Sequence, residues 1–118
     1  MDAIYEIQAA VCRTLSHPTR IAIIHLLGAG PMEVGRLATE LGIAQPNASQ
    51  HLAVMRSSGL VESERAGRGV IYRLSDPGVV DACDAMADVM RRRLARMAEL
   101  AETVGAVSPT STATTATR

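Results

Sequence analysis

The segment from Arg36 to Leu74 constrains the fold of this 118-residue chain more than any other part. Two short helical patterns flank a tight connection at Gly42, and a hairpin pattern follows them. Gly42 comes just after the last apolar residue of the first pattern, where a glycine commonly ends a helix. The hairpin has two glycines in its four-residue connection, at positions 66–69, which is typical of a tight turn. This order predicts a helix-turn-helix followed by a wing, an arrangement that can place one helix in the DNA major groove.

The rest of the chain supplies helices around this segment. Ser16 or His17 can cap a helix that has Pro18 in its first turn, and Ser75 or Asp76 can cap the last helix. We expect helices over residues 3–15, 18–28, 32–41, 45–59 and 77–104, and strands over residues 60–65 and 70–74. The predicted fold is mainly α, a winged helix-turn-helix with a two-stranded β wing.

The last predicted helix carries a long apolar stripe. Its residues step by three or four: Val79, Cys83, Met86, Met90, Leu94, Met97, Ala101 and Val104. A stripe of this length packs on another helix, and in so small a protein a second subunit can provide that helix. We therefore expect a homodimer formed through the first and last helices.

Residues 1–104 form the predicted DNA-binding and dimerisation domain. Residues 105–118, rich in Ser and Thr, are expected to be a disordered tail.

The charges are unevenly distributed although the formal net charge is zero. Residues 41–75 contain four arginines and two glutamates, an excess of two positive charges. Residues 76–104 contain six acidic residues and four arginines, an excess of two negative charges. Every basic residue is Arg, which forms bidentate contacts with phosphate and guanine. The positive half thus coincides with the helix-turn-helix and the wing.

Composition and motifs exclude several other classes of protein. The sequence has two cysteines, far apart and without a CxxC pattern, so a disulfide-stapled secreted domain is not expected. The N-terminus lacks a basic region before an apolar run, and no stretch has 18 uncharged apolar residues, so neither a signal peptide nor a membrane span is predicted. We expect a cytoplasmic protein. There is no nucleophile–base pair and no phosphate-binding glycine loop, so an enzyme is not expected, nor is a cofactor.

Two groups of residues are candidates for contact with double-stranded operator DNA. The first two turns of the fourth helix concentrate short uncharged donors and acceptors, which suit base edges and phosphates. At the tip of the wing, glycines let the backbone approach a duplex, and arginines can reach phosphate or the minor groove. The predicted DNA-binding residues are Gln45, Asn47, Ser49, Gln50, His51, Arg56, Arg65 and Arg68.

These residues also carry a family resemblance. The stretches TLSHPTRIAIIHLL and QPNASQHL, together with the SGLV and GRGVIYRL of the wing, resemble the ArsR/SmtB family of bacterial metal- and stress-responsive repressors. The resemblance covers about residues 5–93. It implies a dimeric winged helix, joined through its first and last helices, that an inducer releases from operator DNA. Ala44 departs from the family, which often has a capping Ser there.

The metal and persulfide sites known in the family are missing here. The arsenic and cadmium type has cysteines on the third helix, where this chain has Glu33–Arg36. The zinc type needs four ligands on the last helix, of which only Asp76 is kept. The persulfide-sensing cysteines correspond to His25 and to a residue near Met90. We therefore predict no metal site of these types.

Two interpretations of the cysteines stay open. Cys12 and Cys83 lie on or beside apolar stripes, where cysteine commonly serves only packing. They are also the thiols on the two predicted interface helices, where they could sense an oxidant, a soft metal or a metalloid.

The predicted function is a sequence-specific repressor with an unidentified inducer. The alternative is a winged-helix module that binds protein and not DNA.

Overall fold

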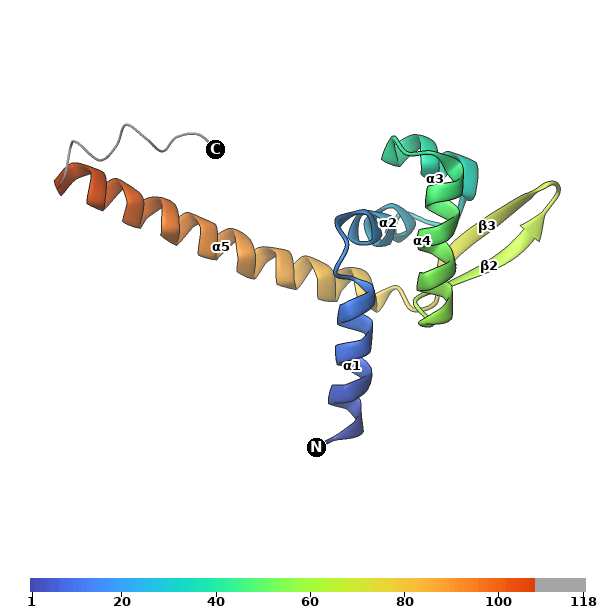
Figure 1. Ribbon diagram of the computed structural model, residues 1–118, viewed down its shortest axis with the longest axis horizontal. Helices are drawn as coiled ribbons and strands as arrows, with labels where there is room; N and C mark the ends of the chain where they lie inside the picture. Colours follow the sequence, from blue (N-terminus) through green and yellow to red (C-terminus); the bar gives the residue numbers. More distant parts are fainter. Residues whose placement is uncertain (108–118) are drawn as a thin grey trace. The chain divides into compact units, whose positions relative to one another are not determined.

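The computed structural model describes residues 1–107 and contains five helices and three strands within them (Figure 1). In chain order the elements are α1 (Ala3–Thr14), α2 (Pro18–Gly28), β1 (Met32–Glu33), α3 (Val34–Leu41), α4 (Gln45–Ser57), β2 (Val61–Ala66), β3 (Gly69–Leu74) and α5 (Gly78–Val107). The chain divides into two compact units, and the second begins at Ala82, within α5. The mainly α winged helix-turn-helix predicted from the sequence is confirmed.

Local sequence signals account for most helix ends. Asp2 caps α1 by accepting a hydrogen bond from the Ile4 amide at 3.0 Å, and Asp76 does the same for the Gly78 amide at 2.8 Å. Gly42 follows α3 with a left-handed backbone, φ 69°, which glycine adopts without a steric penalty. The Ile43 amide then returns to the Ala38 carbonyl at 3.0 Å. These bonds satisfy the backbone groups that each helix end leaves open, and they set the sharp turn between α3 and α4.

The core lies where α2, α3, α4 and the start of β2 meet. Ile23, Ile24, Leu37, Leu52 and Met55 are completely buried. Burying a side chain of this size contributes about 1.5–3 kcal/mol relative to leaving it exposed. The core residues of α4 fall at helical spacing, so packing fixes which face of α4 points away from the protein.

The sheet has one strand more than the sequence predicted. Its order is β1-β3-β2, and both pairs are antiparallel. β1 pairs Met32 with Tyr72 and Glu33 with Ile71. The third helix was expected to begin at Met32, which is wrong, because Met32 and Glu33 extend the sheet and α3 begins at Val34. A strand of two residues is too short to show an alternating pattern.

The first and last helices leave apolar side chains in solvent. α1 buries none of its residues, and Ile4, Tyr5 and Ile7 are more than half exposed. The described part of α5 exposes a longer set: Met86, Val89, Met90, Leu94, Met97, Leu100 and Val104.

α5 runs three residues beyond its expected end at Val104, and residues 108–118 of the expected tail lie outside the described part of the chain. None of the described helices is long and apolar enough to cross a membrane.

Candidate nucleic-acid interface

α4 has one buried face and one polar exposed face. Ala48, Leu52 and Met55 are completely buried. Since a helix turns by about 100° per residue, Gln50 lies roughly opposite these three residues. Gln50 and Asn47 are both exposed, as the prediction for DNA-binding residues requires. Their amide groups can each donate and accept a hydrogen bond in a groove.

The electrostatics of α4 favour an anionic partner. The helix contains no Asp or Glu, and its first turn has no acidic residue. Ala44 occupies the N-cap position and makes no side-chain cap hydrogen bond, so the departure noted in the sequence leaves this end without a carboxylate or hydroxyl. The positive end of the helix dipole is therefore not neutralised by an acidic side chain of the helix.

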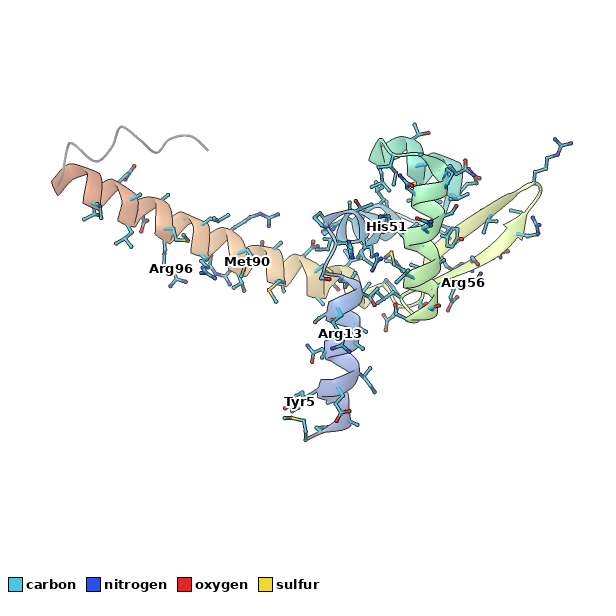
Figure 2. All side chains as sticks on the ribbon, viewed as in Figure 1. Tyr5, Arg13, His51, Arg56, Met90 and Arg96 are labelled. Atoms are coloured by element: carbon cyan, nitrogen blue, oxygen red, sulfur yellow. The ribbon has the colours of Figure 1, made fainter. Side chains whose placement is uncertain are left out.

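His51 lies on the flank of α4 that faces the start of α2 (Figure 2). Its Nδ1 accepts a hydrogen bond from Arg20 Nε at 3.1 Å. Its ring centroid is 5.9 Å from that of His17, and the two rings are tilted by 60°. Burial lowers the pKa of His51, and the nearby Arg20 and His17 lower it further. These surroundings therefore favour the neutral form of His51 over the protonated form.

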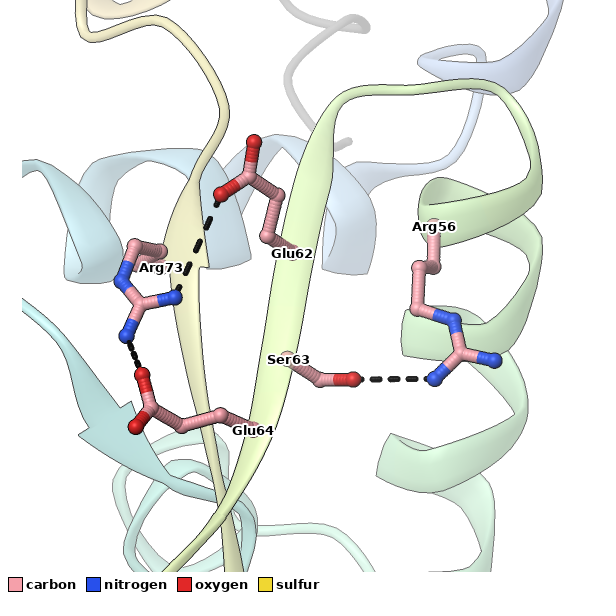
Figure 3. Close-up of polar contacts among 5 residues, drawn as sticks. All are labelled: Arg56, Glu62, Ser63, Glu64 and Arg73. Carbon is pink, nitrogen blue, oxygen red and sulfur yellow. Dashed lines mark hydrogen bonds and ion pairs between the residues drawn. The ribbon is translucent and has the colours of Figure 1, made fainter.

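The opposite flank of α4 faces the wing. Arg56 Nη1 donates a hydrogen bond to Ser63 Oγ on β2 at 2.9 Å (Figure 3). Ser49 is half-buried, and Gln45 is exposed. The Gln45 side-chain oxygen lies 3.4 Å from where a Cβ on Gly35 would stand, so this side chain lies against the first turn of α3. Of the predicted residues on α4, Asn47 and Gln50 are thus the most open to a groove.

The other side of the wing carries its own ion pairs. Arg73 of β3 lies between Glu62 and Glu64 of β2, on the side of the strand away from Arg56 (Figure 3). This cluster neutralises the positive charge of Arg73. At the tip, Gly67 has a left-handed backbone, φ 62°, and Arg65 and Arg68 are exposed. Within residues 1–107 neither Arg65 nor Arg68 has an ion pair, so the available positive charge of the wing lies near its tip.

Similarity to known proteins agrees with this geometry. A family model described as a helix-turn-helix domain matches residues 15–64. An uncharacterized HTH-type transcriptional regulator of Mycobacterium tuberculosis, Rv0081, is 34% identical over 97 residues, covering 81% of this chain and 82% of the relative. The biofilm growth-associated repressor of Xylella fastidiosa is 38% identical over 78 residues, covering 66% of this chain and 68% of the relative.

Solved structures of transcriptional regulators are also similar to this chain. The crystal structure of Rv0081 matches with a TM-score of 0.73 and 31% identity, covering 83% of this chain and 99% of that one. A homodimeric winged helix-turn-helix DNA-binding domain from Mycobacterium bovis, described as a possible ArsR-family regulator, matches with a TM-score of 0.69 and 30% identity. The match covers 78% of this chain and 85% of that one. The chain belongs to the ArsR/SmtB family.

Family membership confirms one expectation directly. ArsR/SmtB proteins are transcriptional regulators, so the chain is not an enzyme. As a family member it keeps the helix-turn-helix and the wing, whose exposed residues are described above. Whether the chain can bind a metal ion depends on the side chains that it brings together.

Those side chains do not gather into a metal-binding cluster. Within residues 1–107 no three His, Cys, Asp or Glu side chains come close enough to hold a metal ion. Cys12 is exposed on α1, and Cys83 is half-buried on α5. They belong to different compact units of this ArsR/SmtB family chain. Packing and thiol sensing therefore both remain predictions for these two cysteines.

Sequence reasoning missed two residues of this region, one that caps a helix locally and one that makes a tertiary contact. Glu33 caps α3 by accepting hydrogen bonds from the Gly35 and Arg36 amides at 2.9 and 3.3 Å. Arg20 reaches His51 from the first turn of α2. The signal for Arg20 is a basic residue near a helix N-terminus, where the helix dipole disfavours positive charge. Glu33 was missed because the helix was expected to begin at Met32, which places Glu33 inside the helix and not at its N-cap.

Proposed function

We propose that this chain is a sequence-specific DNA-binding repressor that acts as a homodimer on a roughly palindromic operator. The observation that carries the proposal is the acid-free exposed surface of α4, on which Asn47 and Gln50 are both exposed and Gln50 stands opposite a completely buried face. In a helix-turn-helix the second helix enters the major groove. The family membership and the repressor relative described above support the same function.

Direct reading of bases is assigned to the two amides. Asn and Gln side chains can bond adenine bidentately in the major groove, where each such pair contributes about 1–3 kcal/mol of discrimination against the wrong base. Gln50 and Asn47 are exposed on α4 and fit this role. Arg65 and Arg68 on the wing would hold the phosphate backbone or the minor groove, which adds affinity at every sequence.

Dimerisation would cover the exposed apolar residues of α1 and α5. Ile4, Ile7, Met90 and Leu94 are each at least two-fifths exposed in the single chain. Burial of such residues against a second copy removes apolar surface from water. The M. bovis relative is homodimeric. A two-fold dimer places two copies of α4 about one helical turn of DNA apart, so the operator should be palindromic.

Release from DNA would respond to an inducer that acts on thiols. Cys12 is exposed in the single chain on α1, one of the two helices assigned to the dimer. A thiol at a subunit boundary could react with an oxidant or bind a soft metal or a trivalent metalloid. Cys83 lies on the other helix, α5. The test compares operator affinity of wild type and Cys12→Ser/Cys83→Ser with and without arsenite or a disulfide oxidant. An identical response of both proteins would leave the cysteines only a packing role.

The central experiment measures base-specific binding. A duplex is selected from a randomised pool by the wild-type protein, and affinities for it and for a random duplex are compared by gel shift. We expect Gln50→Ala and Asn47→Ala each to lose about tenfold or more on the selected duplex and little on the random one. Glu99→Ala, which truncates an exposed side chain on α5, is the control and should bind both as wild type does.

Two results would contradict the proposal in different ways. Equal loss on both duplexes for Gln50→Ala would remove its assignment to base reading. Absence of wild-type binding to any duplex at low salt would favour the alternative, a winged helix that binds protein.

A further inference from the structure

Arg20 occupies a position that local helix preferences disfavour. It is the third residue of α2, whose first turn contains no acidic residue. The positive end of a helix dipole repels a cation there, and His17 at the N-cap makes no side-chain cap hydrogen bond. A local conflict of this kind points to a role in tertiary structure or function.

Two hydrogen bonds hold the guanidinium of Arg20 in place. Its Nε donates to Nδ1 of His51 at 3.1 Å, and its Nη1 donates to the Thr14 carbonyl at 3.0 Å. Thr14 is the last residue of α1, so its carbonyl has no partner within that helix. Because Nε and Nη1 of the same planar guanidinium both have protein acceptors, the guanidinium has a defined orientation, with its Nε–H directed toward α4.

The bond to Nδ1 determines the protonation of the His51 ring. A neutral imidazole carries one proton, and a nitrogen that accepts a hydrogen bond cannot also carry it. Nε2 must therefore hold the proton, so His51 can act only as a donor through its other ring nitrogen. Protonation of Nδ1 would place an N–H against the N–H of Arg20 and would break their bond. The lowered pKa of His51 also favours the neutral form.

The groups around His51 leave this donor without an acidic competitor. Its charged or titratable neighbours with a resolved effect are Arg20 and His17, both from the start of α2. The first turns of α2 and α4 contain no acidic residue. His51 lies on a flank of α4, and a residue on the flank of a helix in the groove is placed toward the bordering phosphates, whereas Gln50 stands opposite the core.

We propose that Arg20 is a positioning residue for α4, the helix proposed to enter the major groove. Arg20 fixes His51 as its Nε2–H tautomer, so that His51 donates a hydrogen bond to a backbone phosphate oxygen. The proposal rests on the DNA-binding function proposed above and assigns one phosphate contact within it. The contact ties the end of α1 to the DNA through Thr14, Arg20 and His51. It adds affinity without base preference, because phosphates are alike at every sequence.

The first experiment reads the tautomer without DNA. A long-range proton–nitrogen correlation spectrum of the histidine-labelled full chain distinguishes a protonated from an unprotonated ring nitrogen. We expect Nδ1 of His51 to be unprotonated in wild type and the two tautomers to mix in Arg20→Lys, because lysine lacks the planar guanidinium whose Nε and Nη1 face the two acceptors together. Arg13→Lys, the same change at an exposed arginine of α1, should leave the spectrum of His51 as it is. A protonated Nδ1 in wild type would overturn the proposal.

The second experiment replaces His51 with each of the two amide residues, because each amide can take the place of one ring nitrogen of His51. His51→Gln places an amide donor near the position of Nε2, whereas His51→Asn keeps an acceptor near Nδ1 but is too short to reach a phosphate. We expect His51→Asn to lose about tenfold in affinity on selected and random duplexes alike, and His51→Gln to bind both duplexes more tightly than His51→Asn. The reverse order would contradict a contact through Nε2.

The third experiment separates positioning from direct charge. Arg20→Lys keeps the positive charge, so the dependence of affinity on salt should stay as in wild type while affinity falls on both duplexes. An unchanged affinity of Arg20→Lys would overturn the positioning role. If wild type binds no duplex, the proposed function fails, whereas the tautomer spectrum still decides whether Arg20 fixes His51.

Discussion

Arg56 near the end of α4 donates a hydrogen bond to Ser63 of β2, with 2.9 Å between Nη1 and Oγ (Figure 3). Arg56 is one of the residues predicted from the sequence to bind DNA. In the structure its guanidinium reaches from α4 to the wing. Since a planar guanidinium has five N–H donors, one bond to Ser63 leaves donors for a phosphate and restricts where the head group can lie.

This relationship makes Ser63 a test of preorganisation. We expect Ser63→Ala to weaken DNA binding by a few-fold, because Arg56 loses its fixed direction while keeping its charge. The slope of affinity against salt should remain as in wild type. Arg56→Ala should weaken binding more and also reduce that slope by about one unit. Identical affinities of Ser63→Ala and wild type at all salt concentrations would show that the hydrogen bond does not position Arg56 for DNA.

Arg68 at the wing tip should act through charge alone. Arg68→Ala is expected to weaken binding to selected and random duplexes equally and to lower the salt slope by about one unit, because one phosphate contact is lost. Arg96→Ala removes the same charge from an exposed position on α5 (Figure 2). Gel shifts at several salt concentrations should show a smaller change for Arg96→Ala. A loss confined to the selected duplex would instead make Arg68 a base-reading residue.

Met90 tests the assignment of α5 to the dimer. Met90 is 41% exposed in the single chain and lies on the apolar stripe of that helix (Figure 2). Met90→Glu would bury a carboxylate between subunits, which is strongly unfavourable without a partner, so we expect a monomer with poor DNA affinity. Sedimentation at micromolar concentration measures the change. Glu99→Gln is the control, and a wild-type protein that is monomeric there would contradict the proposal.

Ala44 offers a test of helix capping. In the structure its carbonyl accepts from the Asn47 and Ala48 amides at 3.0 and 3.1 Å, but its side chain caps nothing. Ala44→Ser should raise the free energy of unfolding by about 0.5–2 kcal/mol, because a hydroxyl at this position can accept from an amide of the first turn. Ala53→Ser adds the same hydroxyl in the middle of α4 and should bring no gain. Urea denaturation compares the two, and equal stability of both variants would refute a capping effect.

His51 should make folding stability depend on pH. Its pKa is lowered in the folded protein by burial and by Arg20 and His17. The unfolded chain therefore binds more protons below about pH 6.5, and stability must rise with pH across this range. We expect the free energy of unfolding to fall as the pH decreases below about 6.5 and to approach a constant contribution above it.

The variant His51→Gln isolates this contribution. Urea denaturation of both proteins between about pH 7.5 and about pH 5 should show a smaller loss for His51→Gln, since the amide does not titrate in this range. Equal losses for the two proteins would mean that His51 does not carry the pH dependence.

The residues of α4 show how far the sequence alone reaches. The spacing of Ala48, Leu52 and Met55 predicts a helix with one apolar face, and all three are completely buried. Gly42 predicts the turn, and its left-handed backbone confirms it. These features follow from neighbours within one or two turns of the chain, where helical periodicity and glycine's freedom act directly. Exposure of Asn47 and Gln50 follows from the same periodicity.

Contacts between distant residues could only be found in the tertiary structure. β1 forms because Met32 and Glu33 lie beside β3, and two residues carry no strand pattern of their own. The pairing of Arg20 with His51 joins residues 31 positions apart, and that of Arg56 with Ser63 joins a helix to a strand. Sequence determined which faces are apolar and which side chains can donate or accept hydrogen bonds. The packing of α2, α3, α4 and the sheet decided which of those donors and acceptors meet, because hydrogen bonds require short distances and defined angles that no sequence pattern encodes.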